Sequence, residues 1–525
     1  MTEPLASFAQ QATLVAALRD PRCYPHAVGS IEVIETHISW VVLTGTYAYK
    51  IKKPLVFDFL DFASLGQRER FCREELRLNR RLEPELYLDV VAITGTPTAP
   101  VIAGSGETVE WAVKMREFER GAELSRLLKT GAVTTAIVDE IADRVAAFHA
   151  TCDRDTSAAG FGSAAAIYLP VRENIDALAR LVTDPGARER LTRLAAWSEA
   201  EHGRLTPTFE RRRAEGFVRE CHGDLHLGNI ALHGGRVVLF DCIEFNPGLR
   251  WIDVMSDVAF LVMDLHQRER PDFARRCLNR WLERSGDYEG LAVLHYYLVY
   301  RALVRAKVAA IRATQGGAQA ANAASESQAL LDLGERFART GAPQLLITQG
   351  VSGSGKTTVT SALLELANLI RIRSDVERKR LFTLSSEARS GSNVDAGIYA
   401  WDATQRTYAR LLALSQGILR AGHSVVVDAT FLDRSDRDAF RALAAVDGAR
   451  FRILACRAHR ETLRERVVMR EQHERDASEA GLPVLARQLE QGVELGDDEL
   501  QEATLIDTSS PIDTRALANA LGLLP

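Results

Sequence analysis

The chain has 525 residues, of which 46% are apolar and 26% are charged, and its net charge is −5. At roughly 150 residues per domain, this length exceeds a single ordinary domain, and the composition is that of a globular enzyme without a long disordered region. The negative charge excludes a protein that binds nucleic acid over its whole surface, although it is compatible with a local basic groove.

The first part of the chain is predicted to form a helix followed by a small sheet. Residues 1–25 have helical spacing, and a charged helix is predicted over 66–82. Strand patterns lie at Ile31–Ile34, Trp40–Thr44, Tyr47–Ile51, Val90–Ile93 and Val109–Met115. These elements predict an N-terminal lobe over about residues 25–118.

Helices dominate the next part of the chain. They are predicted from about 121 to 215 and from 252 to 337, on either side of a strand–loop–strand unit at 217–241. The break at Gly341–Pro343 predicts the end of this helical lobe, which we place at about 119–340. Residues 1–340 are therefore the first predicted module.

After this break the pattern changes to alternating strands and helices. The predicted strands are Leu345–Thr348, Leu369–Arg373, Ser424–Val427, Phe451–Ala455 and Thr504–Ile506. This alternation implies a parallel sheet covered by helices, so residues 341–525 are predicted to form a second module of the α/β class.

A phosphate-binding loop follows the first of these strands. The sequence GVSGSGKT at 350–357 matches GxxxxGK followed by Ser or Thr, and a helix is predicted over 358–367. Glycines let backbone N–H groups surround phosphates, Lys356 is expected to neutralise the outer phosphates, and the Thr357 hydroxyl is expected to bind Mg²⁺. The predicted ATP-binding residues are Gly350, Ser352, Gly353, Ser354, Gly355, Lys356, Thr357 and Thr358.

Two acidic residues stand at strand ends, where open α/β sheets bind ligands. Asp375 follows the second strand and could accept the proton of an acceptor hydroxyl, and the basic run 378–380 beside it could hold an anionic substrate. Asp428 ends the apolar run 425–427 and is typical of an acid that helps to order Mg²⁺. For both acids, a simple helix-capping role is the alternative.

A charged segment near the C-terminus has the features of a lid. It contains Arg464, Arg466, Arg470 and Arg475. Arg466 and Arg470 share one helix face, and a mobile lid would bring them onto the transferring phosphoryl group as catalytic residues. A solvated charged helix is the alternative.

Residues 344–510 resemble the small P-loop kinases that include zeta-toxin-like proteins, gluconate kinase and the kinase part of polynucleotide kinases. The resemblance implies an α/β P-loop NTPase core, ATP, Mg²⁺ and an arginine-bearing lid. It assigns the role of catalytic base to Asp375 from its position after the strand. The acceptor stays open, because these relatives phosphorylate different molecules.

The first module carries a kinase-type catalytic loop, CHGDLHLGN, at 221–229. Asp224 would orient the acceptor hydroxyl and accept its proton, while Asn229 binds Mg²⁺. Asp241 ends the strand over 236–240 and suits a second Mg²⁺ ligand, although the Phe-Gly of the DFG motif is absent. We expect His222 to brace the loop and His226 to lie near the phosphates.

A lysine on the preceding sheet is expected to bind the α- and β-phosphates. Ala48 and Lys50 share one face of their strand, which is typical of the kinase strand that carries this lysine. Lys50 is the first choice, and Lys52 on the same face stays an alternative. Either Glu74 or Glu75, on the helix at 66–82, would pair with it.

Two further segments complete the expected nucleotide site. Met115 lies in the segment 113–118, where the adenine-binding hinge is expected. The short turn Thr44–Thr46 takes the place of a glycine-rich loop over the phosphates.

The sequence HGDLHLGN resembles the catalytic loop of aminoglycoside and choline phosphotransferases, and the resemblance spans about residues 30–310. It implies an α+β protein-kinase-like fold, in which Asp253 and Asp257 support the catalytic loop. The whole chain resembles a bacterial two-domain type, in which an aminoglycoside-phosphotransferase-like domain is fused to a P-loop ATPase or kinase.

Several features bear on the compartment and the partners. The seven cysteines are odd in number and contain no CxxC pair, which favours a reducing compartment. The sequence MTEPLASFAQQ is not that of a secretion signal, and no apolar run approaches the roughly 20 residues that span a bilayer. We therefore expect a cytoplasmic protein without membrane or nucleic-acid partners, whereas the oligomeric state stays open.

Taken together, these motifs predict a bifunctional ATP-dependent phosphotransferase. Both modules would transfer the γ-phosphoryl group of ATP to hydroxyl groups of small molecules such as a sugar, an amino sugar or a nucleoside-like compound. One alternative is that one module binds ATP only to regulate the other. Another is that the C-terminal module phosphorylates nucleotide sugars or nucleic-acid ends.

Overall fold

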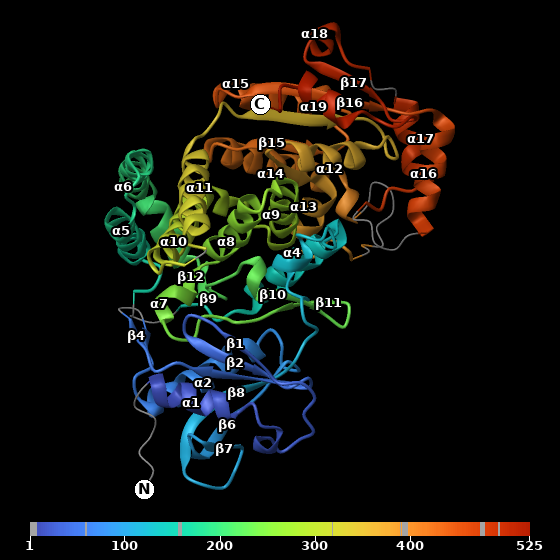
Figure 1. The fold of residues 1–525 in the computed structure, drawn as a ribbon. Helices are drawn as coiled ribbons and strands as arrows, with labels where there is room; N and C mark the ends of the chain where they lie inside the picture. Colours follow the sequence, from blue (N-terminus) through green and yellow to red (C-terminus); the bar gives the residue numbers. More distant parts are fainter. Residues whose placement is uncertain are drawn as a thin grey trace. The chain divides into compact units, whose positions relative to one another are not determined.

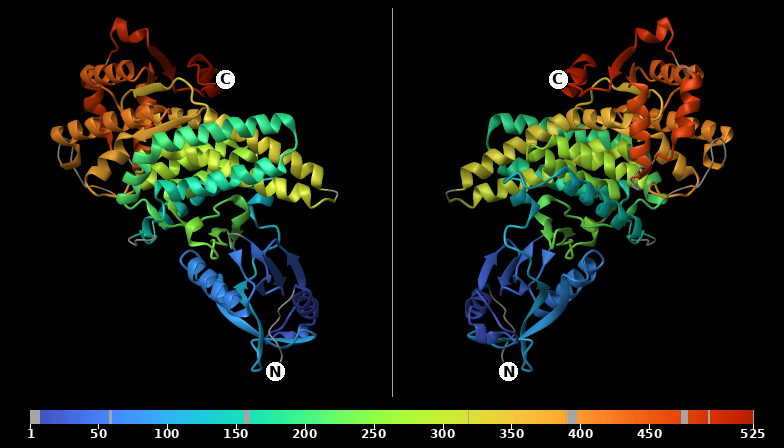
Figure 2. Two further views of the ribbon diagram at one scale, coloured as in Figure 1. Left: turned by 90° about the vertical axis from the view of Figure 1, so that its left-hand side faces the viewer. Right: turned by 90° about the vertical axis from the view of Figure 1, so that its right-hand side faces the viewer.

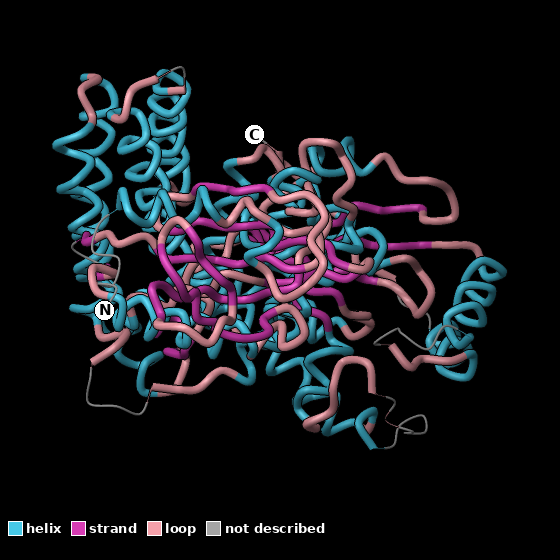
Figure 3. The backbone as a smooth tube through the Cα atoms, turned by 60° about the horizontal axis from the view of Figure 1, so that its bottom comes forward, coloured by secondary structure: helices cyan, strands magenta, loops and turns pink. Residues whose placement is uncertain are grey.

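The structure, a computed structural model, describes residues 8–57, 60–155, 160–317, 319–388, 390, 397–472, 478–491 and 494–524. The chain forms two compact units, one of residues 1–137, 151–167 and 209–264, the other of residues 138–150, 168–208 and 265–525. Four helices contribute residues to both units: α4 (Thr135–Thr151), α5 (Ala164–Leu181), α6 (Pro185–Ala214) and α8 (Val254–Gln267). Within the described chain helices outweigh strands, as the cyan segments of Figure 3 show.

The first unit is built on a six-stranded antiparallel sheet, drawn in blue in Figure 1. Its strands, in spatial order, are β1 (Glu32–Glu35), β2 (Ser39–Leu43), β3 (Tyr47–Lys52), β8 (Thr108–Arg116), β6 (Tyr87–Thr96) and β7 (Ala99–Ile102). Helix α1 (Phe8–Ala17) packs Leu14 and Val15 into a core with residues of these strands. Two short strands, β4 (Val56–Phe57) and β5 (Leu60–Asp61), form a separate pair.

Helix α2 (Leu65–Arg80) covers strands β6 and β8 of this sheet. It begins after Ser64, whose hydroxyl accepts the N–H of Gln67 at 3.1 Å. Its buried residues include Arg68, Cys72, Glu75 and Asn79. Their spacing of three or four residues defines one face of the helix, so Glu75 lies on the face that packs against the sheet.

The remainder of the first unit surrounds the predicted catalytic loop. Its elements are α3 (Leu124–Leu127), β9 (Val218–Glu220), the 3₁₀ turn Leu227–Asn229, β10 (Ile230–His233), β11 (Arg236–Leu239), α7 (Pro247–Arg250) and β12 (Trp251–Asp253). Strands β10 and β11 form an antiparallel hairpin, and β9 pairs with β12. The loop after β9 therefore carries Asp224, and β11 leads directly to Asp241.

The second unit contains a group of long helices. They are α9 (Pro271–Ser285), α10 (Leu291–Thr314) and α11 (Ala320–Ala338), with a 3₁₀ turn at Tyr288–Gly290. Helices α10 and α11 lie side by side along much of their length, as Figure 2 shows. Polar groups join them as well, since the Ser327 hydroxyl of α11 donates to the Ala306 carbonyl of α10 at 3.0 Å, and Leu330 and Leu331 of α11 are buried.

The second unit also contains a five-stranded parallel sheet in the order β14-β15-β13-β16-β17. The strands are β13 (Gln344–Gln349), β14 (Leu369–Arg373), β15 (Ser424–Asp428), β16 (Arg450–Arg457) and β17 (Ala503–Asp507). This sheet confirms the predicted α/β P-loop fold, and the first unit confirms the protein-kinase-like fold. Strand β14 lies at one edge of the sheet.

Helices cover both faces of the parallel sheet. The helices that follow β13 along the chain are α12 (Lys356–Leu366), α13 (Ser374–Leu381), α14 (Trp401–Arg420), α15 (Arg434–Val446), α16 (Arg460–Gln472), α17 (Leu482–Gln491), α18 (Asp497–Leu500) and α19 (Thr514–Ala520). Leu346, Val426 and Leu454 form a buried cluster with residues of α12 and α19. Helices α14 and α15 also contact strands of this sheet. The phosphate-binding loop joins β13 to α12 at the carboxyl ends of the strands.

The compact units do not follow the module boundary predicted between residues 340 and 341, because α9 packs against α12 and β14 within the second unit. As a division of function, that boundary stays a prediction. Among the described residues, no helix is both long and apolar enough to cross a membrane.

Candidate active sites

The catalytic loop of the first unit brings two predicted site residues into contact. The Asn229 side-chain amide donates to a carboxylate oxygen of Asp224 and to the Asp224 carbonyl, both at 3.0 Å. The His226 ring lies 3.4 Å from the same carboxylate. A candidate base and a candidate metal ligand thus share one short loop.

Acidic residues of helix α8 hold this loop in place. Asp257 accepts the backbone N–H groups of His222 at 3.1 Å and Gly223 at 2.9 Å, which confirms its predicted supporting role. Asp264 accepts the N–H of Leu227 at 3.0 Å. Sequence reasoning missed Asp264, because nothing in a helical stretch of the sequence indicates which distant N–H a carboxylate will meet.

His222 braces the loop from inside, as predicted. Its Nε2 lies 2.9 Å from the carbonyl of Phe240, the residue before Asp241. Burial lowers the pKa of His222, and Asp257 and Asp224 act in the opposite direction. A buried neutral imidazole therefore links the loop of Asp224 to the strand that carries Asp241.

The ion pair of the first unit joins Lys50 to Glu75, so Glu75 and not Glu74 is the partner that the sequence left open. Lys50 Nζ lies 2.9 Å from Glu75 Oε1. Glu74 instead contacts Arg77 at 2.8 Å and Arg250 at 2.7 Å. The physical reason is helix geometry, because successive residues point about 100° apart and only Glu75 lies on the buried face.

Both candidate lysines belong to one buried charge network. Lys50 also contacts Asp241, while Lys52 lies 2.6 Å from Glu75 and contacts Glu244. Burial acts to lower the pKa of Lys50, but the carboxylates of Asp241 and Glu75 outweigh it, and the pKa is raised. Of the two described lysines, Lys50 is the one that joins the helix glutamate to the candidate metal ligand Asp241.

The backbone around Asp241 is held in an uncommon conformation. Asp241 has a φ of 68°, in the left-handed region that non-glycine residues seldom adopt. Its N–H donates to the Tyr87 hydroxyl at 3.1 Å, and the next N–H, of Cys242, donates to Asn79 Oδ1 at 2.9 Å. Such local strain persists only where neighbours over-determine it, and it is common at functional sites.

The turn predicted to cover the phosphates is tied to the hinge segment. Glu117 Oε2 accepts the N–H groups of Thr44 at 2.9 Å and Gly45 at 2.7 Å. Met115 pairs in register with Ala48 of β3, so the predicted hinge residue lies beside the strand of Lys50. Sequence reasoning missed Glu117, whose partners are more than 70 residues away.

In the second unit the phosphate-binding loop has the backbone that its glycines permit. Gly353 and Gly355 have φ values of 79° and 81°, and a Cβ at Gly353 would lie 2.8 Å from the carbonyl oxygen of Leu463. Lys356 Nζ donates to the carbonyls of Gly350 at 3.0 Å and Val351 at 2.8 Å. The lysine therefore lies across the loop that it is predicted to serve.

The two predicted metal-site residues of this unit are hydrogen-bonded to each other. Thr357 Oγ1 donates to Asp428 Oδ2 at 2.8 Å, and Asp428 is buried. Burial lowers the pKa of Lys356, whereas Asp428 and Asp375 act to raise it. Asp375 occupies the first turn of α13 and is half-buried. The remaining predicted loop residues, Ser352, Ser354 and Thr358, occupy the same loop and the start of α12.

Helices α16 and α17 bring polar side chains onto the phosphate-binding loop. Arg466 donates to the carbonyls of Gly353 at 3.3 Å and Thr508 at 2.6 Å, and Arg470 donates to the Ser352 hydroxyl at 2.9 Å. Gln488, which sequence reasoning missed, accepts the Ser352 N–H at 2.8 Å. Arg464 is exposed, and Arg475 lies outside the described residues.

The side chains of the basic run beside Asp375 contact the protein itself. Arg378 donates to the Ile398 carbonyl at 3.0 Å, Lys379 lies 3.2 Å from a carboxylate oxygen of Glu479, and Arg380 contacts Glu377. These side chains are engaged with the protein because α13 packs its polar face inward. Their role as substrate ligands stays a prediction.

Two sites of this construction define a class of enzyme, the phosphotransferases of the ATP-dependent kinase type that act on an alcohol group. Family models agree with this class. The phosphotransferase enzyme family matches residues 56–294, and an AAA domain matches residues 345–494.

Two mycobacterial proteins are similar to nearly the whole chain. The uncharacterized protein Rv2004c of Mycobacterium tuberculosis (strain ATCC 25618 / H37Rv) is 31% identical over 473 residues, which cover 89% of this chain and 93% of the relative. The uncharacterized protein Mb2027c of Mycobacterium bovis matches with the same identity and coverage. This chain belongs to their family. In this chain a phosphotransferase module is joined to a P-loop module, as the resemblance implied.

Solved structures are similar to one module or the other. A choline/ethanolamine kinase family protein from Mesorhizobium loti is 13% identical with a TM-score of 0.37, over 63% of this chain and 97% of its own. A gluconokinase from Sinorhizobium meliloti 1021 is 22% identical with a TM-score of 0.23, over 34% and 96%. A putative kinase from Chloroflexus aurantiacus is 21% identical with a TM-score of 0.28, over 35% and 100%. Likenesses this remote say nothing about what this chain phosphorylates.

Proposed function

We propose that both modules of this chain, residues 1–340 and 341–525, transfer the γ-phosphoryl group of ATP to a hydroxyl group of a small molecule, with Mg²⁺ at each site. The observation that carries the proposal is the pairing of predicted residues in each half. Asn229 contacts Asp224 in one site, and Thr357 contacts Asp428 in the other. Each pair supports the proposal, because phosphoryl transfer uses metal ligands of these residue types close together.

In the first module, Asp224 is proposed to orient the acceptor hydroxyl and take its proton. Asn229 and Asp241 would hold Mg²⁺, since amide and carboxylate oxygens suit that ion. Lys50 would bind the α- and β-phosphates, and its contact with Asp241 supports this choice over Lys52. Met115 would border the adenine.

In the second module, the N–H groups of the phosphate-binding loop and Lys356 would hold the β- and γ-phosphates. Thr357 and Asp428 would hold Mg²⁺, and Asp375 would act as the base. Arg466 and Arg470 would stabilise the charge on the transferring group, which their contacts with the loop support.

Single and double variants of the full chain test this proposal. We expect Lys356→Ala and Asp224→Ala each to remove part of the transfer of phosphate from labelled ATP, and the double variant to remove all of it. The acceptors offered are sugars, amino sugars, nucleosides, nucleotide sugars, nucleic-acid ends and a cell extract. If neither single change lowers ATP turnover, the proposal is wrong. If a nucleotide sugar or a nucleic-acid end is labelled, that compound, rather than a sugar, amino sugar or nucleoside, is the acceptor of the second module.

A regulatory role for the first module is the second candidate. One observation favours it. In the turn that should cover the phosphates, the N–H groups of Thr44 and Gly45 donate to Glu117 and are therefore not directed to a phosphate. If the Lys356→Ala variant binds ATP but labels no acceptor, the first module binds nucleotide without chemistry. In either case the proposal locates the protein in the cytoplasm, without membrane or nucleic-acid partners.

A further inference from the structure

Helix α9 is built into the P-loop fold by polar contacts as well as by packing. The Asn279 side chain accepts the N–H of Arg371 at 2.8 Å and donates to the carbonyl of Leu369 at 2.9 Å. It thus pairs with the backbone of the edge strand β14 as a neighbouring strand would. Helix α13, which carries Asp375, follows β14 directly. Helix α9 therefore holds the strand from which α13 starts.

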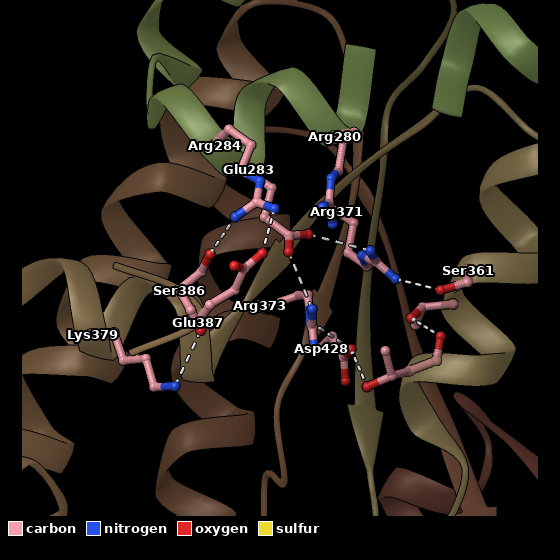
Figure 4. A network of polar contacts seen from close by, with 12 residues as sticks. Arg280, Glu283, Arg284, Ser361, Arg371, Arg373, Lys379, Ser386, Glu387 and Asp428 are labelled. Atoms are coloured by element: carbon pink, nitrogen blue, oxygen red, sulfur yellow. Dashed lines mark hydrogen bonds and ion pairs between the residues drawn. The ribbon is translucent and has the colours of Figure 1, made fainter. Parts of the chain in front are cut away.

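The loop after α13 is held from two sides. Arg284, in the last turn of α9, donates to the Ser386 hydroxyl at 3.1 Å and also contacts Glu387. Lys379 of α13 donates to the Ser386 carbonyl at 3.1 Å. Figure 4 shows Arg284 and Lys379 approaching this loop from their two helices. The second turn of α13 is thereby fixed in place.

Lys379 also forms an ion pair with a residue that follows helix α16. Its Nζ lies 3.2 Å from Glu479 Oε1, and the two side chains are only 1% and 10% exposed. Glu479 accepts, in addition, the N–H of Ser390 at 3.0 Å and its hydroxyl at 2.6 Å. Burial acts to raise the pKa of Glu479, but the hydrogen bonds from Ser390 and the charge of Lys379 outweigh it, so the pKa is lowered and the carboxylate is charged at neutral pH.

Residues 479–488, which we call the lid segment, also contact the phosphate-binding loop. Arg470 of α16 donates to the Ser352 hydroxyl at 2.9 Å and to the carbonyl of Ala480. Gln488 of α17 accepts the Ser352 N–H at 2.8 Å. Ser352 is buried beneath these contacts. The lid segment is thus joined to the proposed nucleotide site and to α13 at the same time.

The order of the strands shows which part of the second site the lid segment borders. The phosphate-binding loop follows β13 and helix α13 follows β14, whereas β15 lies between these two strands. Asp428, the proposed metal ligand, is the last residue of β15. Ligands of open α/β sheets bind at the carboxyl ends of the strands. A segment that contacts the elements after both β13 and β14 therefore borders the place of the proposed phosphoryl transfer.

We propose that Glu479 is a positioning residue of the second site: through its ion pair with Lys379 it fastens the lid segment to α13 and so retains the bound nucleotide. The inference rests on the proposed function of the second module. The nucleotide leaves when the lid segment opens, and opening separates Glu479 from Lys379. If Glu479 loses its charge, the closed lid segment leaves Lys379 buried without an anion, which is costly and favours the open state.

The test measures how fast a fluorescent ADP analogue leaves the full chain when excess ADP displaces it. A Lys50→Met background removes the phosphate-binding lysine proposed for the first site, and the part of the signal that Lys356→Ala removes is assigned to the second site. Glu479→Gln keeps the size of the side chain and removes its charge. We expect it to speed dissociation about tenfold, a factor within the range of interaction energies between residues in contact.

A double variant tests whether Glu479 acts through Lys379. Lys379→Met should speed dissociation to a similar extent, because it breaks the same ion pair. The double variant should be no faster than either single variant. If the two effects multiply instead, the residues act independently and the inference is overturned.

The matched control is Glu490→Gln, because Glu490 lies on α17 and is exposed. It should leave the dissociation rate unchanged. A purely structural role of Glu479 would lower the melting temperature of Glu479→Gln, or prevent its folding, without faster dissociation from the folded protein. Either result overturns the inference.

The outcomes separate the inference from the function on which it rests. If Lys356→Ala does not weaken binding of the analogue in the Lys50→Met background, the proposed nucleotide site of the second module fails, and the inference fails with it. If binding depends on Lys356 and Glu479→Gln leaves the dissociation rate unchanged, the function stands and the inference alone is wrong.

Discussion

Residues two positions apart on strand β3 share one carboxylate but have different surroundings. Lys50 is 8% exposed and contacts Asp241, which faces the catalytic loop, whereas Lys52 is fully buried and contacts Glu244. Alternation along the strand predicts that both lysines point the same way, but it does not predict which one meets Asp241, 191 residues away. The difference matters because one lysine is proposed to act on the nucleotide and the other to hold the fold.

Substituting each lysine separates these roles. We expect Lys50→Met to lower phosphoryl transfer by the first module on the order of 100-fold, because a cation placed for the phosphates is lost. Lys52→Met should instead destabilise the protein by about 3–5 kcal/mol, because it leaves Glu244 buried without its cation. Transfer to acceptor is measured in a Lys356→Ala background, and stability by denaturant unfolding. The assignment of roles is reversed if Lys52→Met folds normally and is the less active variant.

At the scale of elements, local motifs predicted the contacts that lie within one loop. Asp224 and Asn229 are five residues apart, and the phosphate-binding loop spans eight residues, so their geometry follows from the sequence pattern. Contacts between elements did not follow in this way. The support of the catalytic loop by Asp264, and the inward packing of the basic run on α13, depend on how helices pack, which no spacing in the sequence records.

The helix pair α16 and α17 illustrates a prediction that belongs to this scale. Arg470 contacts Ser352 of the phosphate-binding loop, and Arg464, on the same helix, is exposed. We expect Arg470→Ala to lower the maximal turnover of the second module on the order of 100-fold, because a cation near the transferring group is lost.

Arg464→Ala is the matched control and should retain nearly full turnover. Both variants are assayed with labelled ATP in an Asp224→Ala background, with nucleotide affinity measured in parallel. Equal losses in the two variants would favour a merely solvated charged helix and would remove the lid from the mechanism.

For the whole molecule, the sequence was sufficient to predict the two folds and their order along the chain, because each fold has a motif and a characteristic alternation of elements. It was not sufficient for the composition of the compact units. Helix α9 follows the helical pattern of the first module, yet Asn279 and Glu283 meet residues about 90 positions later. A change of pattern locates a change of fold, but it carries no information on which surfaces then pack together.

The free energy of unfolding of the protein should depend on pH through a contact between two histidines that are far apart in the sequence. His295 of α10 stacks on His423, before β15, with ring centroids 4.6 Å apart. Burial lowers the pKa of His295, and burial together with His295 lowers the pKa of His423 to about 3. At pH values between this lowered pKa of His423 and the ordinary pKa of histidine, the unfolded chain binds more protons than the folded one. The free energy of unfolding therefore falls as the pH falls.

We therefore expect the free energy of unfolding to drop between pH 7 and pH 5, with about 2 kcal/mol of the drop due to His423. His423→Gln should flatten this dependence, whatever it does to stability at pH 7. The exposed His459 provides the control, since His459→Gln should leave the pH dependence unchanged. Denaturant unfolding at both pH values checks this, and an unaltered slope in His423→Gln would contradict it.

The pairing of Asn279 with β14 has a consequence for how the two modules can be exchanged between proteins. An edge strand with unpaired backbone groups is a template for strands of other chains, and natural proteins protect such edges. Here the protection comes from a side chain encoded upstream of residue 340. A recombination event that transferred only the segment after residue 340 would produce a sheet whose edge strand β14 is unprotected, and such an edge favours aggregation by strand pairing between chains. We therefore expect a transferred segment to stay monomeric only if it begins at or before α9.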